Sequence, residues 1–346
     1  MNIRTMLEEQ EKKILSPKAA FSSLSRGRLH PEEECPIRPS FQRDRDRIIH
    51  CKSFRRLKDK TQVFLSPSGD HYRTRLTHTL EVSQIARTIA KALSLNETLT
   101  EAISMGHDLG HTPFGHAGED VLNEIHPGGF KHAEQSLRVA DVLEKNGRGL
   151  NLTLEVRDGI LRHSKGRAGL LPTPQDRSLT LEGDIVRVAD TIAYVNHDVD
   201  DGMRAGIIRV EHLPQDCRAI LGETTVERIN TMVTDVIKTT LEHDLERICM
   251  SEDVLSATLS LREYLYQKVY YNSKADSEFT KASKIIKELY EYYFEHPQLL
   301  PDHFTREATS EENIHRAVCD YIAGMTDRFA LRLYQEIFFP KPWLVI

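Results

Sequence analysis

Residues 104–120, SMGHDLGHTPFGHAGED, bring many chemically active side chains into one short stretch. Three histidines, His107, His111 and His116, alternate there with acidic residues and with four glycines. Imidazole and carboxylate groups bind divalent cations, and they transfer protons near neutral pH. The segment is therefore either a polar, solvated turn or the wall of a site that holds a metal ion and moves protons.

The HD dipeptide of this stretch predicts a metal site if other segments complete it. Adjacent residues on a helix point about 100° apart, so both reach one ion only when further ligands come from different helices. Two more candidates lie on segments of helical pattern, His78 in RLTHTLE and Asp190 in VADTIAYVNHD. Two imidazoles and two carboxylates suit a divalent ion such as Mn, Mg, Fe, Ni or Zn, with positions left for water and substrate. The predicted ligands are His78, His107, Asp108 and Asp190.

Proton transfer is the second chemistry that this stretch predicts. A bound ion lowers the pKa of its water from ~15.7 toward ~7, and a leaving group must then be protonated. Glu119 follows His116 by three positions, where a carboxylate can orient an imidazole as a general acid. His111 follows one helical turn after His107. The alternative is that His111 and His116 cap the turn TPFG.

Helices must position these residues, because most long segments show apolar residues at spacings of three and four. Residues 77–93 have one such stripe, Asn96 is a suitable N-cap for ETLTEAISMGHDL, and Gly110 is a suitable stop. The same spacing occurs in LEGDIVRVADTIAYVNHDVDD and in the C-terminal segments KASKIIKELYEYYF and HRAVCDYIAGMTDRFALRLYQEIF.

Strand signals are few along the chain. TQVFLSPSGDHYRTR, residues 61–75, contains an SPSGD turn and predicts a short hairpin. Residues 164–180 read as a loop, since Gly, Pro and Ser interrupt any period. The sequence therefore predicts an all-α fold with a minor short β-hairpin.

Composition places the chain among ordinary globular proteins. It has 346 residues, 39% hydrophobic and 28% charged, which is enough to bury a sizeable core. We expect no export signal and no membrane segment, because residues 1–15 are charged throughout and no run approaches ~18 apolar residues. Five widely spaced cysteines without a CxxC pair argue against disulfides and a thiolate zinc site. We therefore expect a cytoplasmic protein.

A basic run interrupts the overall acidic character. The net charge is −6, yet residues 43–60, RDRDRIIHCKSFRRLKDK, contain eight Lys or Arg against three Asp. Such a run can meet a polyanion, either a nucleotide phosphate or a nucleic acid. The alternative is a solvated helix with ion pairs along its own surface.

The predicted metal ligands resemble those of the HD superfamily of metal-dependent phosphohydrolases. Longer strings resemble, more specifically, the bacterial deoxyguanosine triphosphate triphosphohydrolases and their dNTPase-like relatives, and they span about residues 40–335. These strings are RDRDRIIHCKSFRRLKDKTQVF, RTRLTHTLEVSQIAR, GHDLGHTPFGHAGE, HSKG, ADTIAYVNHDVDD and DYIAGMTDRFALRLY.

The resemblance implies an organisation and a reaction. It implies an N-terminal extension over residues 1–40 and a single domain over 41–346, with an HD core at about 60–205 and a C-terminal helical lobe at about 206–346. The implied reaction is hydrolysis of a deoxynucleoside triphosphate (dNTP) at the α-phosphorus, which gives deoxynucleoside and inorganic triphosphate.

The resemblance also implies roles for individual residues. His116 matches the histidine that protonates the departing 5′ oxygen, Glu119 its supporting acid, and His111 and His132 further active-site histidines near the phosphates. The implied substrate contacts are Gln62 and Asp198 to the sugar 3′-hydroxyl, Tyr194 beneath the sugar and Arg75. Lys165 in HSKG and Arg56 are suitable phosphate partners by charge.

Helix geometry supports part of this assignment independently. Asp190, Tyr194 and Asp198 are spaced by four and so share one helix face. A site that hydrogen-bonds one hydroxyl and excludes a second can discriminate strongly between sugars. The alternative for Tyr194 is ordinary core packing.

Two other functions stay open at this level. One is an HD nucleotidase or phosphodiesterase that acts on a monophosphate or a cyclic or guanosine-tetraphosphate-like substrate. The other is a single-stranded nucleic-acid-binding protein with a vestigial HD pocket, whose binding would weaken steeply with salt. The resemblance further implies a homo-oligomer, tetramer or hexamer, and a second dNTP as allosteric effector.

Overall fold

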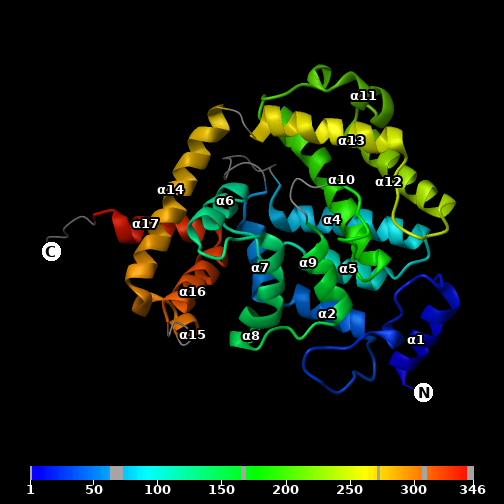
Figure 1. Cartoon of the computed structure of the whole chain (residues 1–346), viewed down its shortest axis with the longest axis horizontal. Helices are drawn as coiled ribbons and strands as arrows, with labels where there is room; N and C mark the ends of the chain where they lie inside the picture. Colours follow the sequence, from blue (N-terminus) through cyan, green and yellow to red (C-terminus); the bar gives the residue numbers. More distant parts are fainter. Residues whose placement is uncertain (1, 63–72, 165–168, 271–272, 306–309, 341–346) are drawn as a thin grey trace, which may run out of the picture.

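The computed structural model describes residues 2–62, 73–164, 169–270, 273–305 and 310–340 (Figure 1). The regular secondary-structure elements within these ranges are all helices. The predicted all-α fold is confirmed. Most of the predicted hairpin lies outside the described residues, and at its base Thr61 and Thr74 form an isolated antiparallel bridge. Among the described residues, none of the helices has both the length and the apolar character needed to cross a membrane.

Seventeen α-helices follow one another along the described ranges, joined by short loops. They are α1 (Ile3–Ile14), α2 (Ser40–Ile49), α3 (Lys52–Arg56), α4 (Arg75–Ala92), α5 (Glu97–Gly106), α6 (His116–Ile125), α7 (His132–Arg138), α8 (Glu144–Gly147), α9 (Leu154–Arg162), α10 (Leu181–Arg204), α11 (Gln215–Leu221), α12 (Thr225–Glu242), α13 (Glu252–Leu265), α14 (Ser273–Glu295), α15 (Asp302–Thr305), α16 (Glu311–Ala323) and α17 (Asp327–Phe338). Short 3-10 or π segments cover Ser22–Leu24, Leu57–Asp59, Val139–Leu143, Val210–His212, Tyr266–Tyr270 and Pro297–Leu299.

Side-chain caps fix where the site-bearing helices begin. Thr74 and Thr77 form a reciprocal capping box at the start of α4. Asn96 caps α5 as the sequence predicts, since its side chain accepts from the backbone of Thr98 and Leu99. Thr180 caps α10 in the same way through Gly183. These caps satisfy amide donors that a helix leaves unpaired at its first turn.

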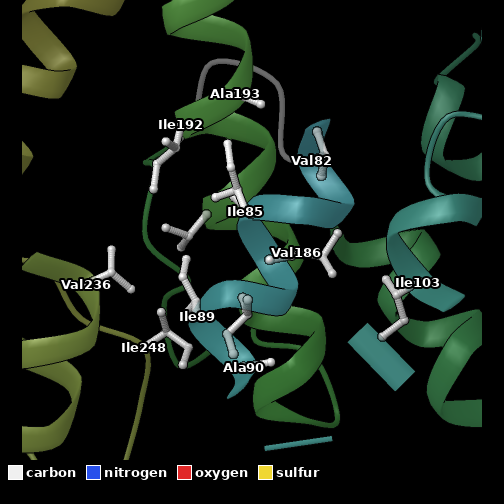
Figure 2. Close-up of a cluster of buried hydrophobic side chains, with 14 of the residues drawn as sticks. Val82, Ile85, Ile89, Ala90, Ile103, Val186, Ile192, Ala193, Val236 and Ile248 are labelled. Atoms are coloured by element: carbon white, nitrogen blue, oxygen red, sulfur yellow. The ribbon is translucent and has the colours of Figure 1, made fainter. Parts of the chain in front are cut away.

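The larger hydrophobic core forms where α4 packs along α10, with α5 on one side and α12 on the other. Figure 2 shows the apolar stripe of α4 directed toward α10 within this cluster. Its buried members include the predicted stripe residues Val82, Ile85, Ala86, Ile89, Ala90 and Leu93. Because α4 and α10 carry His78 and Asp190, this packing fixes the separation between two predicted ligands.

A second cluster of buried hydrophobic residues joins α6 to the C-terminal helices α14, α16 and α17, which lie together on one side of Figure 1. Helices α11 to α13 pack into the first cluster instead. The boundary predicted at about residue 206 therefore does not coincide with the change of core, and the domain limits stay a prediction.

Two predicted helices end earlier than the periodicity indicates. Helix α5 stops at Gly106, so His107 and Asp108 lie in the following turn and not on the helix. The C-terminal segment 315–338 is not one helix but two, α16 and α17, because the chain turns at Gly324 and Thr326 caps α17. Periodicity missed both breaks, because the apolar pattern continues across them.

Candidate metal centre and proton-transfer site

The turn after α5 is held against α7 by one serine. The Ser136 hydroxyl donates to the carbonyl of His107 at 2.6 Å and accepts from the amide of Gly110 at 2.9 Å. A Cβ at Gly110 would lie 2.2 Å from the Ser136 nitrogen. Glycine is therefore required there for close approach of two backbones, and not as the predicted helix stop.

The structure brings the four predicted metal ligands together. Nε2 of His78 lies 3.0 Å from Oδ1 of Asp190 and 4.0 Å from Oδ2 of Asp108. Nε2 of His107 lies 3.4 Å from Oδ1 of Asp108 and 3.8 Å from Oδ1 of Asp190. Ligand atoms of His78, His107 and Asp108 fit a metal-binding cluster, and all three residues are buried. Donors from α4 and the turn therefore form one cluster, and Asp190 of α10 approaches it at its two histidines.

The protonation pattern of His107 fits a divalent ion. Nδ1 of His107 lies 2.6 Å from the carbonyl oxygen of Ser104, and because a carbonyl only accepts, Nδ1 carries the proton. Nε2 then has a lone pair, and this buried atom has no hydrogen-bond partner. Leaving a buried polar atom unpaired is costly, whereas coordination of a cation satisfies it. The residues therefore fit a divalent ion.

Asp108 stays ionised at the centre of this cluster. Burial alone would raise the pKa of its carboxyl, but His107, His111 and Arg75 lower it well below its usual value. Nη1 of Arg75 donates to Oδ2 of Asp108 at 3.0 Å, and both side chains are buried. Burial would also raise the pKa of Asp190, but the bond to His78 together with the charges of His107 and His78 lowers it. Two ionised carboxylates suit a hard or borderline cation.

His111 and His132 form a stacked pair beside the metal cluster. Their ring centroids are 4.1 Å apart with an interplanar angle of 14°. Nε2 of His111 lies 3.3 Å from Oδ1 of Asp108. Burial, Arg75 and His132 lower the pKa of His111 well below its usual value, so its ring is neutral. His132 also lies within ligand range of Asp108 and His111 in a second candidate cluster.

A chain of hydrogen bonds runs from Glu119 through His132 to His163. Both carboxylate oxygens of Glu119 accept from Nδ1 of His132, at 2.9 and 3.0 Å, and Oε1 also accepts from its backbone amide at 2.9 Å. Nε2 of His132 lies 3.2 Å from Nε2 of His163. Nδ1 of His163 donates to the carbonyl of Ile160 at 2.6 Å, which leaves its Nε2 as an acceptor. Both nitrogens of His132 therefore donate, and its ring is an imidazolium.

The pKa shifts agree with this direction of the bonds. Burial lowers the pKa of His132, but the charge and hydrogen bond of Glu119 outweigh it and raise the value. Burial together with His107 and His132 lowers the pKa of His163 to about 3. Burial would raise the pKa of Glu119, yet His132 and His116 bring it to about 2. The bond directions and the raised pKa therefore both favour the positively charged form of His132.

His116 is the first residue of α6 and is the exposed member of the histidine group. Its ring centroid is 6.2 Å from that of His111. Burial of its ring nitrogens lowers the pKa of His116, and the charge of Glu119 only partly opposes this. Glu119 is hydrogen-bonded to His132, so the predicted partnership of Glu119 with His116 stays a prediction.

Lys60 and Asp327 connect the turn after α5 to the C-terminal helices. The buried ammonium of Lys60 donates to the carbonyls of His111 and Ala323, the latter at 2.9 Å. Asp327 accepts from the amide of Thr61 and, through its other oxygen, from the amide of Phe114, both at 3.0 Å. The turn is therefore fixed from two sides, at His107 and Gly110 by Ser136 of α7, and at His111 and Phe114 through Lys60 and Asp327 by α16 and α17.

Comparison with known proteins agrees with this geometry. Residues 75–194 match the HD domain, and residues 248–336 match the phosphohydrolase-associated domain. Over 343 residues the chain is 55% identical to the deoxyguanosinetriphosphate triphosphohydrolase-like protein of Caldanaerobacter subterraneus subsp. tengcongensis, covering 99% of this chain and 98% of that protein. The corresponding proteins of Desulfatibacillum aliphaticivorans and Clostridium perfringens are 52% and 51% identical, each covering 99% of both chains. The chain belongs to this family of HD-domain proteins.

Three residues that the family resemblance assigns to the sugar are placed near this centre. Asp198 and Gln62 are buried, and burial raises the pKa of Asp198 well above its usual value. Oε1 of Gln62 has no hydrogen-bond partner among the residues that the structure describes. Tyr194 is half-buried, and burial together with Tyr266 raises the pKa of its hydroxyl. Asp190, Tyr194 and Asp198 all lie on α10, whose regular turns place them on one face.

The other predicted substrate contacts are less directly placed. Arg75 is buried and donates to Asp108, so at least one of its nitrogens already has a partner inside the HD cluster. Lys165 lies outside the described residues. Nη1 of Arg56 donates to the carbonyl of Gly324 at 3.1 Å. The predicted roles of these residues in substrate binding stay predictions.

The basic run divides between ion pairs and an open cavity. Arg45 pairs with Glu101 at 3.1 Å, and Arg47 pairs with Glu32 at 2.7 Å. A cavity of about 490 Å³ opens between α2 and α8, apart from the HD cluster. Its lining includes the basic residues Arg43, Arg47, Lys52, Arg55, Lys145 and Arg148. Ion pairs thus occur along the run, and its contact with a polyanion stays a prediction.

Within the described residues, sequence reasoning missed His163, His197 and Glu81, which contact the predicted histidines directly or through one another. His163 follows α9 and was visible only as part of the HSKG string. His197 contacts His78, with 3.4 Å between their Nδ1 atoms, and pairs with Glu81 at 2.8 Å. The available signal was spacing, since His197 follows Asp190 by seven residues and Glu81 follows His78 by three.

Proposed function

We propose that the chain is a metal-dependent dNTP triphosphohydrolase. A water oxygen attacks the α-phosphorus, the bond from this phosphorus to the 5′ oxygen breaks, and deoxynucleoside and inorganic triphosphate leave. The single observation that carries the proposal is the buried, unpartnered Nε2 of His107, which faces the carboxylates of Asp108 and Asp190. The family names printed for the 51–55% identical relatives support the substrate class.

Metal and proton chemistry divide between neighbouring residues in this proposal. His78, His107, Asp108 and Asp190 would hold the divalent ion, which supplies Lewis acidity and activates water. Mn, Mg, Fe, Ni and Zn all suit this donor set.

The histidines beside the metal ligands act on the phosphates and the leaving group. His132, fixed as an imidazolium by Glu119, stabilises the negative charge that develops on the triphosphate. His116 is proposed to donate a proton to the departing 5′ oxygen, with Glu119 nearby. His111, stacked on His132, contacts the phosphates as a neutral ring.

Sugar recognition is proposed for the polar groups of α10 and the chain before α4. Gln62 and Asp198 would bond the 3′-hydroxyl, and Tyr194 would lie beneath the ring, where a 2′-hydroxyl would clash. The unpartnered Oε1 of Gln62 supports this proposal, because a buried amide oxygen without a donor favours a ligand hydroxyl. Arg75 and Lys165 are proposed to contact the phosphates.

A product assay tests the reaction. The protein is incubated with each of the four dNTPs, with Mn²⁺ or Mg²⁺, and the products are separated by anion-exchange chromatography. Deoxynucleoside and triphosphate are expected from the unchanged chain and from the control variant His212→Gln, which alters an exposed histidine. His107→Ala should lose activity by several orders of magnitude. Formation of monophosphate and pyrophosphate would refute the bond assignment and favour another HD phosphohydrolase.

The basic cavity between α2 and α8 supports a second polyanion site. Its seven Lys or Arg side chains suit the triphosphate of a second dNTP acting as effector, in a tetrameric or hexameric protein. Rates with single dNTPs and with mixtures, measured beside the oligomer mass by light scattering, test both statements. Filter binding of single-stranded DNA at two salt concentrations tests the alternative occupant, since such binding falls steeply with salt.

A further inference from the structure

A histidine that belongs to neither the ligand set nor the proton-transfer group contacts His78 from behind, and a glutamate contacts that histidine in turn. Nδ1 of His78 lies 3.4 Å from Nδ1 of His197, and the two rings meet edge to face with centroids 5.6 Å apart. Nε2 of His197 lies 2.8 Å from Oε2 of Glu81. His78 and Glu81 are on α4 and His197 is on α10, so the contact crosses the helix pair that forms the larger core.

The direction of these bonds follows from the donors and acceptors alone. A carboxylate only accepts, so Nε2 of His197 carries a proton and donates it to Glu81. Arg73 also donates to Glu81, at 3.2 and 3.3 Å, so a cation already compensates this carboxylate. Nδ1 of the neutral His197 ring is then an acceptor, and the bond between the two Nδ1 atoms needs the proton of His78. Because the carboxylate of Asp190 also faces Nε2 of His78, Nε2 offers a lone pair when a cation, and not a proton, lies between them.

Nε2, the other ring nitrogen of His78, faces the metal cluster. Nε2 lies 3.0 Å from Oδ1 of Asp190 and 4.0 Å from Oδ2 of Asp108. A lone pair and a carboxylate oxygen at 3.0 Å repel each other unless a proton or a cation lies between them. A proton on Nε2 would have to leave before a metal could bind, whereas a proton held on Nδ1 does not interfere. The position of one proton therefore decides whether His78 is a ligand.

We propose that His197 and Glu81 are positioning residues that hold the proton of His78 on Nδ1, so that Nε2 is available to a divalent cation. Nδ1 of His107 is fixed separately by the Ser104 carbonyl, a backbone acceptor that no side-chain substitution removes. The two imidazole ligands are thus oriented by different means, and only the orientation of His78 depends on other side chains. This inference rests on the metal centre of the proposed function.

The chain of contacts from Glu81 through His197 to His78 is called the relay below. Three substitutions distinguish an effect of this relay on the His78 proton from an effect of packing alone. His197→Leu removes the acceptor for the His78 proton, and a 10- to 100-fold loss of metal affinity is expected, as for other groups that hold metal ligands. His197→Asn places an amide oxygen near the position of Nδ1 and should recover most of the affinity. Glu81→Gln lets an amide donate to His197 and invert the chain of bonds. Its loss should be about tenfold, because the Glu81 side chain is 40% exposed and water competes there.

The test measures binding of the metal alone, without substrate. Mn²⁺ and Zn²⁺ are titrated into the full chain in competition with a chromophoric chelator, for the unchanged protein, the three variants and the control Glu291→Gln, which alters an exposed carboxylate. In parallel, nitrogen-15 NMR of histidine-labelled, Zn²⁺-loaded protein should show His78 protonated on Nδ1. A structural role alone would lower the melting temperature without changing this tautomer.

The outcomes distinguish this inference from the proposed function. Affinities that fall for His197→Leu and Glu81→Gln but not for His197→Asn or Glu291→Gln support the relay. Equal affinity in the unchanged chain and in Glu81→Gln overturns the relay and leaves the dNTP hydrolase standing. If the unchanged chain binds no divalent ion, the relay and the metal centre are both wrong. Folding of Glu81→Gln and His197→Asn keeps the test decisive even if His197→Leu does not fold.

Discussion

Glu119→Gln is the substitution that most directly tests the charge on His132. The change keeps the shape of the side chain and removes the carboxylate that accepts two bonds from Nδ1 of His132. Without that carboxylate, burial alone acts on the imidazolium and lowers its pKa. His132 should therefore lose its second proton at a lower pH in the variant than in the unchanged protein.

The size of the effect follows from the hydrogen bond that is lost. A hydrogen bond to a charged group contributes about 1.5–3 kcal/mol. At about 1.4 kcal/mol per factor of ten, the fraction of His132 carrying both protons falls by about 10- to 150-fold where the neutral ring dominates. Glu119 itself stays ionised throughout the assay range, because its pKa is about 2. The change in profile therefore reports His132 and not titration of Glu119.

The assay is the pH profile of kcat/KM for dGTP between pH 5 and 10, at saturating Mn²⁺. The unchanged protein should hold its rate up to the raised pKa of His132 and lose it as pH rises through that value. The variant should lose its rate at a distinctly lower pH, and by the factor given above where its His132 ring is neutral while that of the unchanged protein still carries both protons. Glu291→Gln serves as the control and should leave the profile unchanged. A Glu119→Gln profile that is scaled down uniformly, with no displacement along the pH axis, would refute this account of His132.

Three further predictions concern stability and metal binding. Asp327→Ala leaves the amides of Thr61 and Phe114 without acceptors, so the free energy of unfolding should fall by about 2–5 kcal/mol in urea denaturation, and a loss below about 1 kcal/mol would contradict the role of this carboxylate. Gly118→Ala places a Cβ 2.1 Å from the Pro113 carbonyl and should cost about 1–3 kcal/mol despite the better helix propensity of alanine, whereas Gly128→Ala, with its nearest contact at 3.6 Å, should be nearly neutral. Equal stability of the two glycine variants would show that the backbone yields there. Chelation with EDTA should abolish dNTP hydrolysis and lower the melting temperature. Mn²⁺ at 100 times its Kd should then restore about 2.7 kcal/mol of the free energy of unfolding, as measured by calorimetry. An unchanged melting temperature would argue against a metal at the HD cluster.

The sequence indicated the four candidate ligands because each lies in a segment with a readable helical pattern, and their role as ligands stays a prediction. His78 and Asp190 occupy helical segments whose apolar stripes fix which faces meet, and the HD pair follows a helix whose N-cap, Asn96, is evident. Packing of α4 on α10 then brings the ligands together, as the stripe of α4 predicts. Convergence of the four donors follows from periodicity and chemistry alone.

The supporting contacts could not be predicted in this way, since each joins segments far apart in sequence. His163 meets His132 across 31 residues, and Lys60 meets the carbonyl of Ala323 across 263. Neither pair has a spacing that periodicity can register, and a buried lysine is indistinguishable in sequence from an exposed one. The end of α5 at Gly106 was hidden similarly, because the hydroxyl that replaces its last helical contacts comes from Ser136.

The junction made by Lys60 and Asp327 has a consequence for how small a working fragment can be. Residues 75–194, which match the HD domain, contain all four metal ligands but neither of these two side chains. A fragment cut to those limits would present the right donors on an untethered turn, with the His111 carbonyl and the Phe114 amide exposed to water. The position of this turn thus depends on both cores, and substitutions deep in the C-terminal helices are expected to lower the activity proposed for the HD cluster.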